Sequence, residues 1–136
     1  MRVVFDTNVF VSALVMPGSL SDEAYRRAIG QEFELVTSVA ILTELAGKLR
    51  AKFGWESVPI TRAIKAISRV GEVVKTVPHL DIARDPADNR VLECAEKAGA
   101  DLIVTGDRHL LKMRRFGRTG IVKVSTFLHS LGAAVQ

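Results

Sequence analysis

The stretch Val3-Val4-Phe5-Asp6-Thr7-Asn8 joins a short apolar run to an acidic side chain and two further polar residues. An apolar run of this kind, followed by a turn signal, is typical of a strand buried on both faces of a parallel sheet. Asp, Thr and Asn all favour the first position of a helix, so the stretch predicts a strand that passes directly into a helix.

The same alternation of strand and helix continues along the chain. Further strands are expected at residues 33–37, 73–77, 101–105 and 121–124. Helices are expected at residues 8–15, 21–30, 38–53, 60–70, 85–99, 107–114 and 127–131. Ser38, Asp85 and Ser125 are expected as N-caps, Ser21 or Ser19 as the N-cap of the second helix, and Pro59 as the first residue of the helix that continues from Ile60. This order predicts an α/β, single-domain, Rossmann-like three-layer fold, with a central, mostly parallel sheet of about five strands and helices on both faces.

Length and composition indicate one globular domain over residues 1–136. A hydrophobic content of 48% argues against disorder. The single cysteine, Cys94, excludes an internal disulfide framework and a cysteine-rich zinc site, and its helical apolar pattern predicts a packing role. One unpaired cysteine suits a reducing compartment, so a cytoplasmic location is expected.

Several classes of protein lack their sequence signals here. Asp6 interrupts the first apolar stretch, so no secretory signal is predicted, and no run approaches the roughly 20 apolar residues that span a bilayer. The chain contains no phosphate-binding G-x-x-x-x-G-K-[ST], no dinucleotide-binding G-x-G-x-x-G and no G-x-S-x-G motif. These absences argue against a membrane protein, a nucleotide-cofactor enzyme and a serine hydrolase.

Four acidic residues are the strongest candidates for chemistry: Asp6, Glu44, Asp88 and Asp107. Each lies at or near a predicted passage from strand to helix, and the carboxyl ends of parallel strands meet at one edge of a sheet. Carboxylates gathered at one edge repel one another, and a cation relieves that repulsion. The pattern therefore predicts a divalent-metal site.

Each acid also has a simpler explanation. Asp6 and Asp107 could act only as N-caps, and Glu44 could form an exposed i,i+4 pair with Lys48. Asp88 shares a helix stripe with apolar residues, where a carboxylate is costly, although the N-terminal helix dipole favours it. The metal hypothesis depends on their joint convergence.

The ligand type predicts the chemistry. Carboxylates and waters suit Mg²⁺ or Mn²⁺, whereas the three histidines have no zinc-like spacing. A metal held this way can activate water for hydrolysis of a phosphodiester without a covalent intermediate.

A basic stretch favours a nucleic-acid substrate. The chain has a net charge of +4, and residues 108–118 contain no acid but carry Arg108, His109, Lys112, Arg114, Arg115 and Arg118. Basic side chains beside an acidic metal site are expected to contact the phosphates of RNA. A solvated helix face and loop would explain the same residues.

Several segments together resemble the PIN-domain family, in particular VapC-like toxin components of toxin–antitoxin systems. The segments are Val4-Phe5-Asp6-Thr7-Asn8-Val9, Thr37-Ser38-Val39-Ala40-Ile41-Leu42-Thr43-Glu44, Asp85-Pro86-Ala87-Asp88-Asn89, Leu102-Ile103-Val104-Thr105-Gly106-Asp107 and Val124-Ser125-Thr126-Phe127-Leu128. The resemblance covers nearly the whole chain, and it is specific because the segments occur in this order and spacing.

The resemblance implies an endoribonuclease dependent on Mg²⁺ or Mn²⁺. It assigns metal-binding and catalytic roles to Asp6, Glu44, Asp88 and Asp107 and supporting roles to Thr105 and Asn8. It also implies a homodimer and an antitoxin partner that blocks the site. A PIN-like module that only binds RNA or protein is the alternative, and a nuclease directed at DNA is a third reading.

Overall fold

The computed structural model describes residues 1–132 and contains one sheet in that range. Its strands are β1 (Arg2–Phe5), β2 (Glu34–Ser38), β3 (Glu72–Val74), β4 (Leu102–Val104), β5 (Arg115–Phe116) and β6 (Thr119–Val122). The strand order is β3-β2-β1-β4-β6-β5, and every pairing is parallel except the antiparallel β5–β6 pair. The predicted α/β fold with a mostly parallel central sheet is confirmed.

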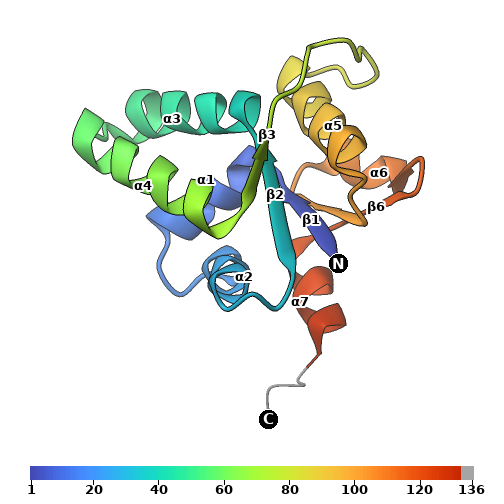
Figure 1. Ribbon diagram of the computed structural model, residues 1–136, viewed down its shortest axis with the longest axis horizontal. Helices are drawn as coiled ribbons and strands as arrows, with labels where there is room; N and C mark the ends of the chain where they lie inside the picture. The colour runs from blue at the N-terminus through green and yellow to red at the C-terminus, as the bar shows by residue number, and fades with distance from the viewer. Residues whose placement is uncertain (133–136) are drawn as a thin grey trace.

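Helices cover both faces of the sheet, as Figure 1 shows, with α1, α2 and α4 on one side and α5 and α6 on the other. They are α1 (Thr7–Val15), α2 (Leu20–Ile29), α3 (Val39–Phe53), α4 (Ser57–Val70), α5 (Pro86–Ala98), α6 (Arg108–Met113) and α7 (Val124–Leu131). Most of these boundaries lie within one or two residues of those predicted. Among the helices of residues 1–132, none combines the length and the apolar character needed to cross a bilayer.

Aromatic packing fixes one face of the sheet. Phe5 of β1 lies 5.5 Å from Phe10 and 5.9 Å from Phe33 between ring centroids. Phe127 of α7 meets Phe33 edge-on at 4.9 Å, and all four rings are buried. Edge-to-face pairs at these distances stabilise beyond the area they bury. They hold β1 rigidly, and the residue that follows β1 is Asp6.

The sheet has one more strand than predicted, and its third strand is displaced. The missed strand is β5, which pairs with β6 through a turn at Gly117, whose φ of 58° suits glycine. A strand of two residues is too short to show an alternation of apolar and polar side chains, so its sequence resembled a loop. β3 covers residues 72–74 rather than 73–77, because only these pair with β2.

Two helices begin three residues earlier than predicted. Helix α4 starts at Ser57, so Pro59 is its third residue; proline fits there because first-turn N–H groups have no partner within the helix. Helix α7 starts at Val124 after Lys123, and Ser125 is therefore inside the helix rather than its N-cap. The predicted caps Ser38 and Asp85 are confirmed: their side chains accept hydrogen bonds from the N–H groups of Ile41 and Ala87.

Candidate functional site

Asp6 and Thr105 lie side by side at the carboxyl edge of the sheet. They follow the paired residues Phe5 and Val104 of β1 and β4, and the Asp6 N–H donates to the Val104 carbonyl at 2.9 Å. The Thr105 hydroxyl donates to Asp6 Oδ2 at 2.6 Å, and both side chains are buried. Burial raises the pKa of Asp6, and the hydrogen bonds from Thr105 and Asn8 oppose that rise. The supporting position predicted for Thr105 agrees with this geometry.

Asp107 is tied to the same edge through Thr105. The Asp107 N–H donates to Thr105 Oγ1 at 3.0 Å. Its carboxylate Oδ1 accepts from the N–H groups of His109 and Leu110, at 2.7 and 3.4 Å, and so caps α6. The simpler capping explanation therefore holds for Asp107, and the residue also lies at the predicted edge.

Asp88 is the most perturbed acid. It lies in the first turn of α5 and is only 5% exposed, and its carboxylate has no hydrogen-bond or ion-pair partner among residues 1–132. Burial and the negative charges of Asp107, Asp6, Asp85 and Glu44 raise the pKa of Asp88 to about 7. The three other predicted acids are thus all near enough for their charges to affect Asp88. We refer to Asp6, Glu44, Asp88 and Asp107 as the acidic site.

Glu44 enters the acidic site from α3 beside a lysine. Lys48, one turn further along α3, places Nζ 3.8 Å from Glu44 Oε1 and donates to Asn8 Oδ1 at 2.9 Å. The backbone N–H of Asn8 donates to Asp6 Oδ1 at 3.4 Å, so Asp6 is the N-cap of α1. The Glu44–Lys48 pair expected for a helix surface is present, and Lys48 also reaches α1. Sequence reasoning treated Lys48 only as a partner for Glu44; its spacing gave no sign of the contact with Asn8.

The chemistry of the donors fits a hard divalent cation, but a closed cage is not formed. Carboxylate oxygens are the preferred ligands of Mg²⁺ and Mn²⁺, and the repulsion at Asp88 is of the kind a cation relieves. Within residues 1–132, however, no group of three or more His, Cys, Asp or Glu side chains is arranged so that it could hold a metal ion. The described residues thus supply carboxylate oxygens near Asp88 but no cluster of three or more such side chains around one point.

A buried clamp that the sequence did not reveal positions α5. Asn89 Oδ1 accepts from the N–H groups of Ile82 and Ala83, at 3.0 and 2.8 Å. Glu93 Oε2 accepts from the N–H groups of His79 and Leu80, at 2.7 and 2.8 Å. Both side chains are buried on α5, and they hold residues 79–83 against it. The clamp fixes the approach to α5, whose first turn carries Asp88.

The basic stretch is exposed beyond the acidic site. The side chains of Arg108, His109, Lys112, Arg114, Arg115 and Arg118 are all exposed on α6 and the β5–β6 hairpin. Helix α6 begins directly after Asp107, so these cations start where the acidic site ends. This exposure agrees equally with phosphate contacts and with a solvated surface.

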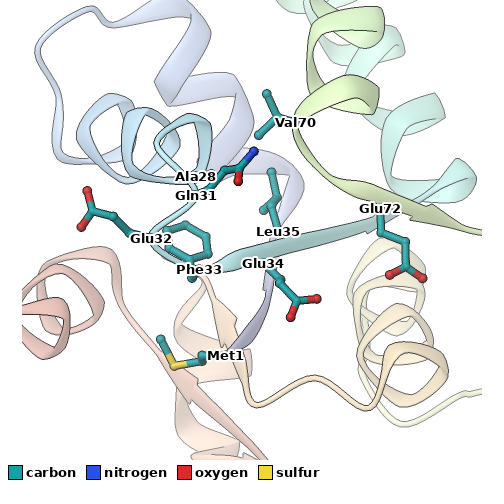
Figure 2. A pocket seen from close by; sticks show the side chains of 9 residues that line it. All are labelled: Met1, Ala28, Gln31, Glu32, Phe33, Glu34, Leu35, Val70 and Glu72. Atoms are coloured by element: carbon teal, nitrogen blue, oxygen red, sulfur yellow. The ribbon is translucent and has the colours of Figure 1, made fainter.

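A cavity of about 470 Å³ lies elsewhere, near the start of β2 (Figure 2). Glu34 and Glu72 line it, and Arg2 forms an ion pair with each of them, at 2.9 and 3.1 Å. Because Glu34 and Glu72 begin their strands, this cavity is at the edge of the sheet opposite the acidic site. Because the cavity lies at that opposite edge and Arg2 pairs with Glu34 and Glu72, it is separate from the acidic site.

Cys94 belongs to the core. The side chain is fully buried, and burial raises the pKa of its thiol to about 12. A thiol in this state is a poor nucleophile, which confirms the packing role predicted for it.

Comparison with known proteins places the fold and the family. A family model described as PIN domain matches residues 2–109. The uncharacterized protein MJ1680 of Methanocaldococcus jannaschii is 32% identical over 118 residues, which cover 83% of this chain and 75% of that protein. The match to the PIN-domain model includes all four residues of the acidic site.

Two solved structures share the fold. The crystal structure of VapBC2 from Rickettsia felis, bound to a DNA fragment from their promoter, aligns with a TM-score of 0.64 and 14% identity, over 90% of this chain and 98% of that one. The crystal structure of PAE2754 from Pyrobaculum aerophilum aligns with a TM-score of 0.62 and 22% identity, over 100% of this chain and 90% of that one.

Proposed function

The chain belongs to the PIN-domain family, and on that premise we propose that it is a metal-dependent endoribonuclease. PIN domains are generally nucleases, so hydrolysis of a phosphodiester bond is the reaction that the family supports. The finer proposal is that the substrate is RNA and that the metal is Mg²⁺ or Mn²⁺.

The observation that carries this proposal is the state of Asp88. A buried carboxylate with a pKa of about 7, close to the charges of other acids, reduces the stability of the folded protein. A role in function accounts for its presence despite that loss of stability. A surface cap or a helix-surface pair explains Asp107 and Glu44 separately, but neither explains an acid buried among acids. A divalent cation would offset all four charges together.

Each residue of the acidic site has a role in the proposed reaction. Asp6 and Asp88, as the buried acids, would contact the metal most directly, while Glu44 and Asp107 complete the negative charge around it. Thr105 holds Asp6 Oδ2 in one orientation, and Asn8 supports the opposite oxygen. A bound Mg²⁺ or Mn²⁺ would supply an activated water and offset the charge on the leaving oxygen.

The basic stretch is proposed to contact the substrate backbone. A single-strand-selective or structure-selective activity is proposed, because an A-form duplex constrains the bases and the scissile backbone. Contacts to phosphates predict an affinity that falls as salt rises. Charge reversal at Arg114 and Arg115 should weaken RNA binding and reduce its salt dependence.

A toxin role is proposed from the likeness to VapC-like proteins and to VapBC2. On this proposal residues 1–136 act as one nuclease domain in the cytoplasm, as a homodimer, and an antitoxin protein blocks the acidic site. Expression with and without a small neighbouring gene tests the toxin role directly: growth arrest relieved by that gene is expected, and unaffected growth in both cases contradicts it.

The reaction itself is tested with purified protein. Labelled single-stranded RNA and DNA of the same sequence are incubated with Mg²⁺, with Mn²⁺ and with EDTA. We expect RNA cleavage that stops in EDTA and in Asp88→Asn, and that persists in Asp81→Asn, a control for an exposed loop acid. Cleavage unchanged in EDTA excludes the metal role, and binding of RNA without cleavage in any metal favours a binding module.

A further inference from the structure

A lysine lies within the acidic site. Lys48 Nζ donates to Asn8 Oδ1 at 2.9 Å and lies 3.8 Å from Glu44 Oε1. Its side chain is 24% exposed, so most of it is covered. A lysine that only lies on a solvated helix surface would have neither this burial nor a hydrogen bond to a second helix.

The contacts of Lys48 cross between two elements of the site. Glu44 and Lys48 lie on successive turns of α3. Asn8 lies in the first turn of α1, two residues after Asp6. The ammonium donates one hydrogen bond, to Asn8, and its contact with Glu44 at 3.8 Å is an ion pair longer than a hydrogen bond. The positive charge is therefore held beside Glu44 by one hydrogen bond and one ion pair.

We propose that Lys48 is the resident counter-ion of the acidic site and competes there with a divalent cation. The proposal rests on the metal role given above to the acidic site. When no metal is bound, the ammonium offsets part of the carboxylate charge and joins α3 to α1 through its hydrogen bond to Asn8. When a metal enters, it meets a site whose net negative charge Lys48 has already reduced. Lys48 is thus a positioning residue that sets how readily the site takes up its ion.

The proposed role predicts that removing the charge of Lys48 has opposite effects on the stability of the metal-free protein and on its affinity for the metal. Lys48→Met leaves the carboxylates more negative, so it destabilises the metal-free protein and tightens metal binding. A residue that only ties α3 to α1 would weaken both, because a loosened site binds its ion less well. Lys48→Arg keeps the charge and serves as the conservative variant, although its fork does not reproduce the point charge of lysine.

The test is calorimetric titration with Mn²⁺ at low ionic strength, together with thermal unfolding with and without Mn²⁺. We expect Lys48→Met to lower the metal-free Tm and to bind Mn²⁺ about fivefold more tightly than the wild type, as expected for loss of one partly exposed charge. Lys48→Arg should bind within about twofold of the wild type. Lys52→Met is the matched control, since Lys52 is exposed in the last turn of the same helix, and it should change neither quantity.

The outcomes separate this proposal from the proposed function. Unchanged or weaker Mn²⁺ binding in Lys48→Met, with normal binding by the wild type, overturns the counter-ion and leaves the nuclease intact. Absence of binding by the folded wild type overturns both. If Lys48→Met does not fold, Lys48→Gln replaces it, because its amide can still donate to Asn8 while lacking the charge. Tighter binding in Lys48→Gln supports the proposal, and unchanged or weaker binding overturns it.

Discussion

Replacing Asp88 with asparagine is expected to stabilise the metal-free protein at neutral and alkaline pH. The substitution keeps the shape of the side chain and removes a charge that is buried without a hydrogen-bond or ion-pair partner among residues 1–132. Isolated buried charges are strongly unfavourable, whereas a neutral amide of the same size is much less so. The acid that we assign to function thus reduces stability in the absence of a cation.

The size and the pH range of the effect follow from the shift. Burial and neighbouring acids raise the pKa of Asp88 from an ordinary 3.8 to about 7. The folded state therefore holds a proton that the unfolded state has lost, and the free energy of unfolding falls as pH rises from about 4 to 7. Three pKa units correspond to about 4 kcal/mol as an upper limit, reached above pH 7, and screening by solvent makes the measured loss of stability smaller than this. The pKa of Asp6 is also raised, so the measured titration belongs to both acids.

Urea unfolding in EDTA at pH 5 and pH 8 measures this effect. The wild type should lose stability between the two pH values, and Asp88→Asn should lose less, so that the variant is the more stable protein at pH 8. Asp81→Asn, in an exposed loop, should behave as the wild type at both values. An equal difference between wild type and Asp88→Asn at the two pH values, or a less stable variant at pH 8, would refute the reasoning.

Three further substitutions test other parts of the structure. Thr105→Val removes the 2.6 Å bond to buried Asp6 and should lower the free energy of unfolding by about 1–3 kcal/mol in urea, whereas Thr105→Ser should retain most of it. Asn89→Ala should expose the amides of Ile82 and Ala83 to faster hydrogen exchange, and unchanged exchange there would contradict the clamp. Arg114→Gly relieves a φ of 61° and should raise stability by about 1 kcal/mol in urea; an equal gain in Arg114→Ala would point to the side chain instead.

The centre of the fold could be predicted from the sequence because local and global signals agree there. The apolar run before Asp6 predicts a buried strand, and Asp85 followed by proline predicts the start of α5. Right-handed crossovers then place the strand ends at one edge, so the gathering of Asp6, Asp88 and Asp107 follows from topology.

The parts that could not be predicted depend on contacts between distant segments. The strand β5 exists only because β6 pairs with it, and its two residues carry no pattern of their own. The clamp formed by Asn89 and Glu93 depends on where residues 79–83 return to α5. The bond between Lys48 and Asn8 joins residues 40 apart, and helix periodicity cannot report it.

Capping and metal binding looked like competing explanations for the acids, but the structure makes them compatible. A carboxylate has two oxygens and about four acceptor positions. At Asp107 a single oxygen, Oδ1, accepts both N–H groups of α6, and Oδ2 has no hydrogen bond among residues 1–132. The cap therefore fixes the side chain and leaves one oxygen for another partner. An acid at a helix start is held in one orientation by the N–H groups that it caps, and a fixed orientation is also what a cation site requires of its ligands.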